Sequence, residues 1–314
     1  MSAEPGAATI EARGLTRKFG AHTAVKGIDL ELKRGEVLGF LGPNGAGKTT
    51  TMQMLTGNLA PTGGAINICG IDLLEAPVAA KARIGYLPEH PPLYREFTVD
   101  EYLLLAAKLH RVPRARCREA VETSKRRCGL ANSGAKLLGT LSRGFQQRVG
   151  IAQAIVHSPD VVILDEPTVG LDPHQIREIR SLIRELGGKH SVILSTHILP
   201  EVEAVCDRVQ ILHHGSLVYG DTIAALKRSR GGSAVLLGLQ RAPSLDTLAA
   251  IPGIAQVHAV SPVLFRVDFH PHDDATERLA AQAAKNDWGL FQISPVHTSL
   301  EDVFVQLTRH EEVD

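Results

Sequence analysis

The sequence has no excess of charge of either sign. Its 314 residues include 34 Lys and Arg against 34 Asp and Glu, so the formal net charge at pH 7 is +0. Proteins that bind nucleic acid generally carry a basic surface that neutralises phosphates. Nucleic acid is therefore not the partner that this composition predicts.

A long apolar run and a leader-like start are also missing. No stretch approaches the roughly 18 consecutive apolar residues of a membrane-spanning helix. Residues 1–5 have neither the basic nor the apolar region of a signal peptide. We therefore expect a cytoplasmic chain with no transmembrane segment and no signal peptide.

Cysteines are few and scattered. The four of them contain no C-x-x-C pair, which disfavours a disulfide framework and a zinc site. They are Cys69, Cys117, Cys128 and Cys206. Among the 14 histidines, His213 and His214 precede Gly215 in what reads as a turn. Free thiols, and no metal other than magnesium, are expected.

The run from Gly42 to Thr49 matches the G-x-x-x-x-G-K-[ST] pattern (Walker A) at every specified position. In such a loop, backbone N–H groups turn towards phosphates, Lys48 reaches the β and γ oxygens, and the Thr49 hydroxyl ligates magnesium. An apolar run of strand length at residues 37–41 precedes the loop, and no Gly or Pro occurs from residue 49 to 55. This context disfavours the alternative, a Gly-rich turn that arose by chance. The predicted nucleotide-binding residues are Gly42, Pro43, Asn44, Gly45, Ala46, Gly47, Lys48, Thr49 and Thr50.

An apolar run that ends in two carboxylates is the second decisive feature. Residues 161–164, Val-Val-Ile-Leu, lead directly into Asp165 and Glu166. At the carboxyl edge of a sheet shared with the phosphate loop, Asp165 would hold magnesium and Glu166 would polarise the attacking water. The plainer alternative is a strand that ends in solvent, which the preceding phosphate loop and the following Pro167-Thr168 disfavour.

The order of apolar patterns predicts an α/β fold with a parallel core. Apolar runs at residues 161–164 and 191–194 flank a helical stretch at residues 174–186, as a doubly covered parallel sheet requires. Short antiparallel strands are expected before the phosphate loop, and helical spacing begins at residue 99. A β subdomain and a helical insertion at about residues 90–160 should therefore accompany the nucleotide core.

The stretch from Leu141 to Arg148, Leu-Ser-Arg-Gly-Phe-Gln-Gln-Arg, resembles the signature motif of ABC ATPases, usually L-S-G-G-Q followed by Q-Q-R. The other motifs of that family follow in the right order over residues 8–225. They are Phe19 for the aromatic that stacks on adenine, Glu89 for the Q-loop glutamine, Gly170-Leu171-Asp172 for the D-loop and His197 for the switch histidine. The resemblance implies a P-loop ABC nucleotide-binding domain that binds ATP with Mg²⁺ and hydrolyses it.

The same resemblance implies a shared active site. Two nucleotide domains, in a homodimer here, would close head to tail on two ATP molecules. Each phosphate loop would then face Ser142 and Gly144 of the other copy, where a helix N-terminus suits a γ-phosphate. By the same resemblance, His197 would position the attacking water and Asp172 would link the two sites. Without the family context, a satisfied polar residue at a strand end is an equal interpretation of His197.

Three positions depart from the family pattern. Glu89 replaces the glutamine, which keeps an oxygen for catalysis or magnesium but adds a negative charge near the phosphates. Arg143 replaces the first glycine of the signature and is either a phosphate neighbour or an outward-facing charge. Phe145 replaces the terminal glutamine. An active ATPase is still expected, because Lys48 and the residues of the carboxylate strand are retained.

Two stretches resemble ATP-binding subunits of exporters whose membrane half is a separate polypeptide, including the gliding-motility and multidrug export group. They are residues 84–94 and residues 299–304, the latter expected as a C-terminal helix. The resemblance implies a subunit that powers export by ATP-dependent dimer closure, peripheral at the cytoplasmic face of the inner or plasma membrane. Its integral membrane permease partner would contact residues 89–101, for which ordinary surface is the alternative.

Two other classes of function share some of these motifs. A non-transport ABC ATPase that acts on ribosomes or DNA would share every nucleotide motif, but the sequence has neither the second nucleotide domain nor the long coiled coil of such proteins. A small-molecule kinase or GTPase would share the phosphate loop alone, and no N-K-x-D guanine motif occurs. The partner that copurifies, a membrane protein or a ribosome, separates transport from the first alternative.

A composition shift near residue 230 predicts a second domain. Residues 229–233, Ser-Arg-Gly-Gly-Ser, read as a linker between the ABC ATPase domain at 8–228 and a small α+β domain at 234–310. The expected order βαββαβ suits a ferredoxin-like split unit. Ligand sensing, dimerisation and bracing of the nucleotide domain are all open roles, of which bracing or dimer support is the plainer.

Overall fold

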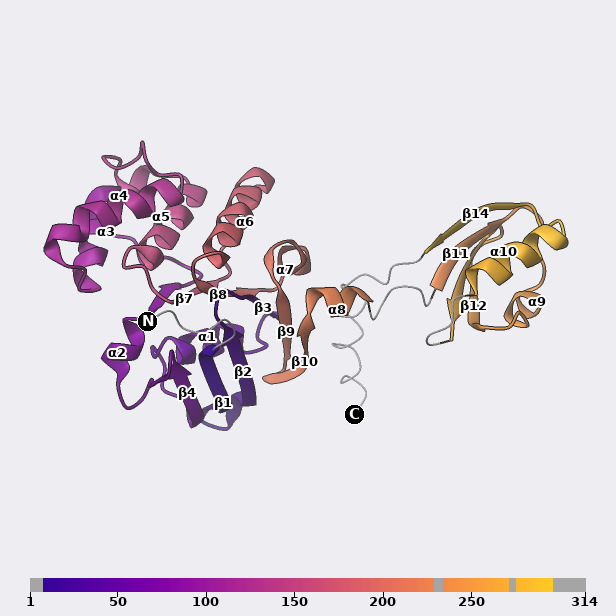
Figure 1. Ribbon diagram of the computed structural model, residues 1–314, viewed down its shortest axis with the longest axis horizontal. Coiled ribbons are helices and arrows are strands. Elements are labelled where there is room, and N and C mark those ends of the chain that lie inside the picture. The colour runs from indigo at the N-terminus through magenta and orange to yellow at the C-terminus, as the bar shows by residue number, and fades with distance from the viewer. Residues whose placement is uncertain (1–7, 229–233, 271–274, 296–314) are drawn as a thin grey trace. The chain divides into compact units, whose positions relative to one another are not determined.

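The structure is a computed structural model, and it describes residues 8–228, 234–270 and 275–295 (Figure 1). It divides into two compact units, Met1–Ile223 and Ala224–Asp314. The predicted linker at residues 229–233 and the predicted C-terminal helix at residues 299–304 lie outside the described residues.

A six-stranded sheet with the order β10-β9-β3-β8-β7-β6 is the centre of the first unit. The strands from β9 to β6 are parallel, and β10 pairs antiparallel with β9. Their bounds are β3 Val37–Leu41, β6 Ile84–Leu87, β7 Val161–Asp165, β8 Ser191–Thr196, β9 Arg208–His213 and β10 Ser216–Thr222. The predicted parallel core is confirmed, and it brings the carboxyl ends of β3, β7 and β8 to one edge.

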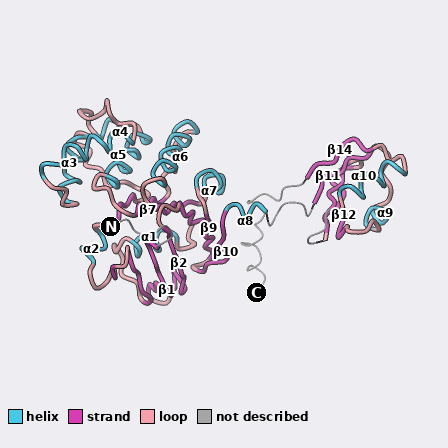
Figure 2. Tube along the Cα trace, viewed as in Figure 1, coloured by secondary structure: helices cyan, strands magenta, loops and turns pink. Residues whose placement is uncertain are grey.

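Both faces of this sheet are buried, which explains the continuous apolar runs at residues 161–164 of β7 and 192–194 of β8. In β7, Val162 and Leu164 pack into one hydrophobic core, while Val161 and Ile163 pack into another on the opposite face. Four helices cover the first core (Figure 2). They are α3 Val99–Leu109, α4 Cys117–Arg127, α5 Arg143–Ile155 and α6 Pro173–Gly187.

The second core lies between the central sheet, helix α1 (Lys48–Leu55) and a four-stranded antiparallel sheet. That sheet has the order β2-β1-β4-β5 and is the predicted β subdomain. Its strands are β1 Ala8–Phe19, β2 His22–Lys33, β4 Gly63–Ile68 and β5 Ile71–Asp72. The short helix α2 (Pro77–Lys81) leads from this sheet back to β6.

Helices α3 to α5 are inserted between β6 and β7. Thr98 begins α3 with a capping box, in which its hydroxyl accepts the N–H of Glu101 and the Glu101 carboxylate accepts the N–H of Thr98. Leu109 shares the helical spacing of the buried residues of α3 but is 73% exposed, because the helix ends there. Helix α5 packs so closely on β6 that a Cβ atom at Gly85 would lie 1.9 Å from the carbonyl oxygen of Ala154. Two 3₁₀ turns, Arg114–Arg116 and Leu138–Thr140, complete the insertion.

The second unit contains a four-stranded antiparallel sheet of order β12-β13-β11-β14. Its elements are β11 Ala234–Leu239, α9 Leu245–Ala249, β12 Ile254–Ser261, β13 Leu264–Phe269, α10 Thr276–Lys285 and β14 Leu290–Pro295. Phe265, Val267 and Leu279 lie in a hydrophobic core formed by residues of this unit alone. The remaining helices of the chain are α7 Leu199–Val205 and α8 Ile223–Arg228.

Two further expectations from the sequence can be compared with the described residues. In that part of the chain, no helix combines the length and the apolarity that crossing a membrane needs. All four cysteines are free thiols, as expected, with Cys117 and Cys128 buried.

Candidate functional site

The phosphate loop runs from the end of β3 into α1, in the strand, loop and helix context that the sequence predicts. Gly47, the residue before α1, has φ +103°, and a Cβ atom there would lie 2.5 Å from the carbonyl oxygen of Ala24. Gly45 has φ +80°, a conformation that suits glycine. Because the first N–H groups of a helix have no partner within it, the start of α1 can bind an anion.

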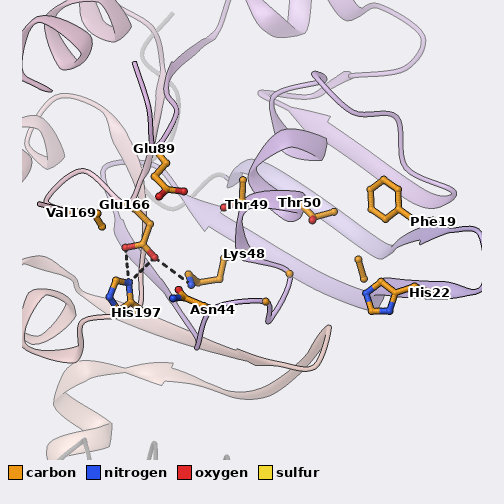
Figure 3. A pocket seen from close by; sticks show the side chains of 13 residues that line it. Phe19, His22, Asn44, Lys48, Thr49, Thr50, Glu89, Glu166, Val169 and His197 are labelled. Carbon is orange, nitrogen blue, oxygen red and sulfur yellow. Dashed lines mark hydrogen bonds and ion pairs between the residues drawn. The ribbon is translucent and has the colours of Figure 1, made fainter. Parts of the chain in front are cut away.

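Lys48 is the centre of the site (Figure 3). Its side chain is 6% exposed, and its Nζ donates hydrogen bonds to the carbonyl oxygens of Gly42 (2.9 Å) and Pro43 (3.2 Å). Nζ also lies 3.3 Å from Oε1 of Glu166. The predicted phosphate-binding lysine and the predicted base therefore meet, although 118 positions separate them (166 − 48) in the chain.

Glu166 follows β7 in a left-handed backbone conformation, with φ +49°. Its N–H donates to the carbonyl oxygen of Ser195 at 2.9 Å, which fixes the turn. Such a conformation costs a non-glycine residue on the order of 1–3 kcal/mol. In exchange, the turn places the carboxylate in the cavity between Lys48 and His197 (Figure 3).

His197 comes from the neighbouring strand, one residue after the end of β8. Its Nδ1 lies 3.1 Å and 3.0 Å from the two oxygens of Glu166. The side chain is 40% exposed, so the remainder of the imidazole faces the cavity and solvent. A base whose carboxylate is held by an imidazole and an ammonium can orient and deprotonate a water molecule.

Asp165, the residue before Glu166 in the chain, is buried. Burial raises the pKa of its carboxyl group, while the hydroxyls of Ser195 and Thr49 oppose the rise and the charges of Glu166 and Glu89 add to it. Among the described residues, no group forms a hydrogen bond of good geometry with either carboxylate oxygen. Buried oxygens without partners are suited to a cation, and Mg²⁺ takes few protein ligands when it also binds phosphates. Asp165 and Thr49 therefore fit the predicted magnesium site.

One cavity of 580 Å³ is lined by Lys48, Thr49, Glu166 and His197 but not by Asp165. Its lining residues are Phe19, His22, Ala24, Asn44, Gly45, Gly47, Lys48, Thr49, Thr50, Glu89, Glu166, Val169 and His197. The cavity thus brings together the predicted adenine-stacking aromatic, much of the phosphate loop, the Q-loop glutamate and the switch histidine. His22, Ala24 and Val169 also line the cavity but were not predicted, because nothing in their local sequence marks them.

Phe19 and Glu89 lie at the edges of this cavity. Phe19 is 46% exposed, and the guanidinium of Arg17 lies 4.5 Å from the centre of its ring. An exposed ring of this kind can stack on a base. Glu89 is 40% exposed in its side chain and lies 3.9 Å from His90 Nδ1. Its charge acts on the site by raising the pKa of Asp165.

Gly42, Pro43 and Ala46 of the phosphate loop are not among the lining residues, and neither are three predicted nucleotide-binding residues outside the loop, Ser142, Gly144 and Asp172. Ser142 begins α5, where its Oγ accepts the N–H of Phe145 at 3.4 Å. Gly144 is buried beside the side chain of Gln175. Asp172 begins α6, and its Oδ1 accepts the N–H groups of His174 and Gln175 at 2.9 Å. Within one copy, these residues are helix caps and helix starts.

Arg143 and Phe145, the two residues that depart from the signature pattern, both contact other side chains or backbone of the same chain. The exposed Arg143 lies against the backbone of Gly170, where a Cβ atom would be 2.4 Å from its Nη1. Phe145 is 37% exposed, and the cations of Arg148 and Lys136 lie 5.6 and 6.0 Å from its ring centre. The signature turn is thus in contact with the D-loop segment of its own chain.

A buried carboxylate that the sequence did not reveal connects the segments that follow β7 and β8. Glu201 in α7 is 1% exposed and accepts hydrogen bonds from the hydroxyls of Thr168 (2.5 Å) and Thr196 (3.0 Å). Thr168 follows Glu166 and Thr196 precedes His197. The only local signal for this role is a glutamate four residues after His197, in the first turn of α7.

The comparisons with known proteins agree with this geometry. The family model described as ABC transporter matches residues 25–169, and a second model, of an AAA domain, matches residues 137–202. The chain is 34% identical to the bacitracin transport ATP-binding protein BcrA of Bacillus licheniformis, over 95% of this chain and 96% of that protein. It belongs to the ABC transporter ATP-binding proteins.

Other members of the family have similar sequence identity to this chain. The daunorubicin/doxorubicin resistance ATP-binding protein DrrA of Streptomyces peucetius is 32% identical over 99% of this chain and 95% of its own length. A solved structure of an ATP-binding subunit of an ABC transporter is 32% identical, with a TM-score of 0.64 over 70% of this chain and 92% of that chain. The P-loop ABC ATPase fold is therefore confirmed, and the protein is an ABC-type ATPase that binds ATP. ABC ATP-binding proteins of this kind work with membrane permease subunits.

Proposed function

We propose that this chain is the ATP-hydrolysing subunit of an exporter whose membrane half is a separate polypeptide. The observation that carries the proposal is the contact of Lys48 and His197 with the same carboxylate, that of Glu166, inside the phosphate-loop cavity. Export rests on the relatives, because BcrA is named for bacitracin transport, DrrA for daunorubicin/doxorubicin resistance, and a third for Nod factor export.

In the proposed reaction, the phosphate loop holds the triphosphate of ATP and Phe19 stacks on the adenine. Glu166 takes a proton from the attacking water, and His197 holds that carboxylate and the water in position. Glu89, at the cavity edge, is a further oxygen near the reacting phosphate and the metal. Thr49 and Asp165 would hold Mg²⁺, which neutralises charge on the β and γ oxygens when bound.

The active form is proposed to be a homodimer that closes on ATP. Ser142, Gly144 and Asp172 support this part of the proposal, because they do not line the cavity of their own copy. The hydroxyl and the start of α5 would complete the γ-phosphate site of a second copy. ATP binding would then pull two copies together, and hydrolysis would release them.

Glu166→Gln tests dimer closure, because it preserves the shape of the site and removes the base. Size-exclusion chromatography with light scattering should show a monomer without nucleotide and a dimer with ATP and Mg²⁺. Lys48→Ala added to the same variant should abolish the ATP-dependent dimer. A Glu166→Gln protein that stays monomeric with ATP contradicts the proposal of dimer closure.

The permease is proposed to bind beside the Q-loop, at the cytoplasmic face of the membrane. A cavity of 520 Å³ lies there, lined by residues from α1, β6 and the segment that follows β6. They include Gln53, Tyr86, Pro88 and Pro92. Tyr94, 52% exposed in the same segment, adds an apolar contact. A protruding helix of a membrane partner fits such a groove.

Affinity purification from detergent-solubilised membranes tests the partner. An integral membrane protein should copurify, and Tyr94→Glu should reduce its yield while leaving the ATPase activity of the isolated chain intact. Recovery of ribosomes or DNA in place of a membrane protein would favour the non-transport alternative, which neither the relatives nor the charge supports.

A further inference from the structure

A second cavity, of 540 Å³, lies in the helical part of the first unit. It is bounded by the connection from α3 to α4, by one side of α4, and by the turn between α5 and β7. None of its lining residues lines the cavity around Lys48. It is therefore separate from the ATP site.

The charges around this cavity are mostly positive. Arg111, Arg116 and Arg127 line it, against one carboxylate, Glu119. Along α4, Ala120, Thr123 and Arg127 share one face of the helix, so the arginine at the end of α4 borders the same space as the arginine before its start. An anion that enters meets guanidinium groups at both ends of the cavity.

Two partly buried side chains here have unused hydrogen-bonding atoms. Arg127 is 14% exposed, and its Nη1 lies 3.0 Å from Nε2 of His190. Among the described residues, Nε and Nη2 of Arg127 have no hydrogen-bond partner, although Nε is 3.5 Å from a carboxylate oxygen of Glu185. A buried guanidinium with free N–H groups costs free energy that an anionic ligand would recover.

His157 supplies a hydrogen-bond acceptor, whereas the arginines supply donors. Its Nε2 lies 3.1 Å from the carbonyl oxygen of Ile84, so Nε2 carries the proton and Nδ1 is an acceptor. Nδ1 is buried and has no partner among the described residues. The ring stacks on His110, with 3.7 Å between the ring centres, which fixes its orientation at the cavity wall. The cavity thus offers the arginine donors together with an imidazole acceptor, besides the carboxylate of Glu119.

The backbone around the cavity is strained at two positions. Arg111 and Ser158 both have left-handed conformations, with φ +58° and +51°. Both line the cavity. Non-glycine residues in this conformation cost free energy and are frequent at ligand sites. Their occurrence on both sides of one basic cavity supports a role in binding.

We propose that this cavity binds a phosphomonoester, either a free metabolite or the headgroup of a lipid. The oxygens of a phosphomonoester accept hydrogen bonds from guanidinium groups. Below its second pKa of about 6 the phosphomonoester is mainly a monoanion, which carries one P–OH that can donate to Nδ1 of His157. Sulfate has the same shape and no such donor at that pH. The combination of arginine donors and an imidazole acceptor therefore selects phosphate over sulfate.

Calorimetric titration of the full chain with glycerol 3-phosphate at about pH 5.5, where the monoanion predominates, tests the site. A non-hydrolysable ATP analogue fills the phosphate loop beforehand, so that the loop does not bind the probe. One glycerol 3-phosphate should bind per chain, roughly tenfold more tightly than sulfate. Arg116→Ala and Arg111→Ala should each weaken binding by about tenfold, the loss of one charge-assisted hydrogen bond. His157→Phe should remove the preference over sulfate.

Matched controls lie on the same segment. Arg114 and Arg118 are exposed but do not line the cavity. Their alanine variants should bind glycerol 3-phosphate as the unchanged protein does. No binding, equal affinity for sulfate, or equal losses in all four arginine variants would each overturn the proposal.

Flotation with vesicles separates the two sources of the phosphomonoester. If the ligand is a lipid headgroup, phosphatidylcholine vesicles that contain phosphatidic acid should bind the protein, and glycerol 3-phosphate should displace it. If the ligand is a free metabolite, glycerol 3-phosphate binds and the vesicles do not. Equal binding to phosphatidylglycerol vesicles, unchanged by Arg116→Ala, would show attraction to surface charge alone and overturn the lipid assignment.

Discussion

Nδ1 of His197 lies 3.0 Å from Oε2 of Glu166, across the gap between two neighbouring parallel strands. The contact unites the residue after β7 with the residue after β8. It depends on the left-handed turn at Glu166, which directs the carboxylate towards His197 instead of along the strand.

Replacing Glu166 by Gln should reduce the rate of ATP hydrolysis by about 100-fold or more, because general base catalysis contributes about 10²- to 10⁴-fold. ATP affinity should be retained, since Lys48 and the phosphate loop are unchanged. Phosphate release and equilibrium binding of a fluorescent ATP analogue measure the two quantities. Turnover that is unaffected by Glu166→Gln would disprove the assignment of the base.

Replacing Glu201 by Ala should destabilise the first unit by about 2–4 kcal/mol, because buried hydroxyls of Thr168 and Thr196 lose their acceptor. Turnover should also fall, since Thr168 lies two residues after the proposed base and Thr196 directly precedes His197. Urea unfolding measures the stability. Glu203→Ala, on the exposed side of the same helix, is the control and should change neither quantity. Equal effects of the two substitutions would rule out a specific role for Glu201.

Replacing Gly85 by Ala should destabilise the protein by about 3 kcal/mol or more, because the added Cβ atom meets a backbone oxygen of α5 at 1.9 Å and neither backbone can move freely. Gly63→Ala is the control, because its Cβ atom would meet only ordinary contact, 3.9 Å from Thr16. Thermal unfolding compares the two. A Gly85→Ala protein as stable as the Gly63→Ala protein would contradict the close packing of β6 on α5.

The protein should lose stability in mild acid through His157. Burial, and then the charge of His110, lowers the pKa of His157 from 6.5 to about 4. The unfolded chain therefore binds the proton first, so the stability linked to this group is complete above pH 6.5 and is lost progressively towards pH 4. The full loss is up to about 3 kcal/mol.

His157→Gln should flatten this dependence, since glutamine has no proton to bind in that range. Urea unfolding of both proteins between about pH 7 and pH 4, roughly the interval between the two pKa values, measures the difference. His258 is exposed in β12, and His258→Gln is the control. It should leave the dependence of the free energy of unfolding on pH unchanged. Identical slopes in the His157→Gln protein and the unchanged protein would contradict a depressed pKa.

The sequence was most informative where one local pattern contains the whole chemistry. The phosphate loop and the Asp165-Glu166 pair are such patterns, because a short run of residues fixes both the backbone and the functional groups. The parallel core followed from apolar runs that face two cores. Contacts that arise only when strands assemble could not be predicted in the same way. Glu201 reaches Thr168 across 33 positions, and the left-handed turn at Glu166 depends on the carbonyl of Ser195 in the next strand.

The place of Arg143 illustrates the same limit. Its residue type left two interpretations open, a phosphate neighbour and an outward-facing charge. The structure adds a contact that neither interpretation contained, because the guanidinium lies on the backbone of Gly170. The sequence around a D-loop glycine does not predict which side chain will pack on its backbone.

The burial of the cysteines has a practical consequence for spectroscopy. Burial raises the pKa of the Cys128 thiol to about 12. It also raises the pKa values of Cys206 and Cys69. Only the thiolate attacks maleimides and methanethiosulfonates at a useful rate. A single cysteine engineered at an exposed site, such as Glu203, should therefore take up a spin label or a fluorophore ahead of the native thiols. Distances between labels on two copies can then be followed through a catalytic cycle in a chain that keeps all of its own cysteines.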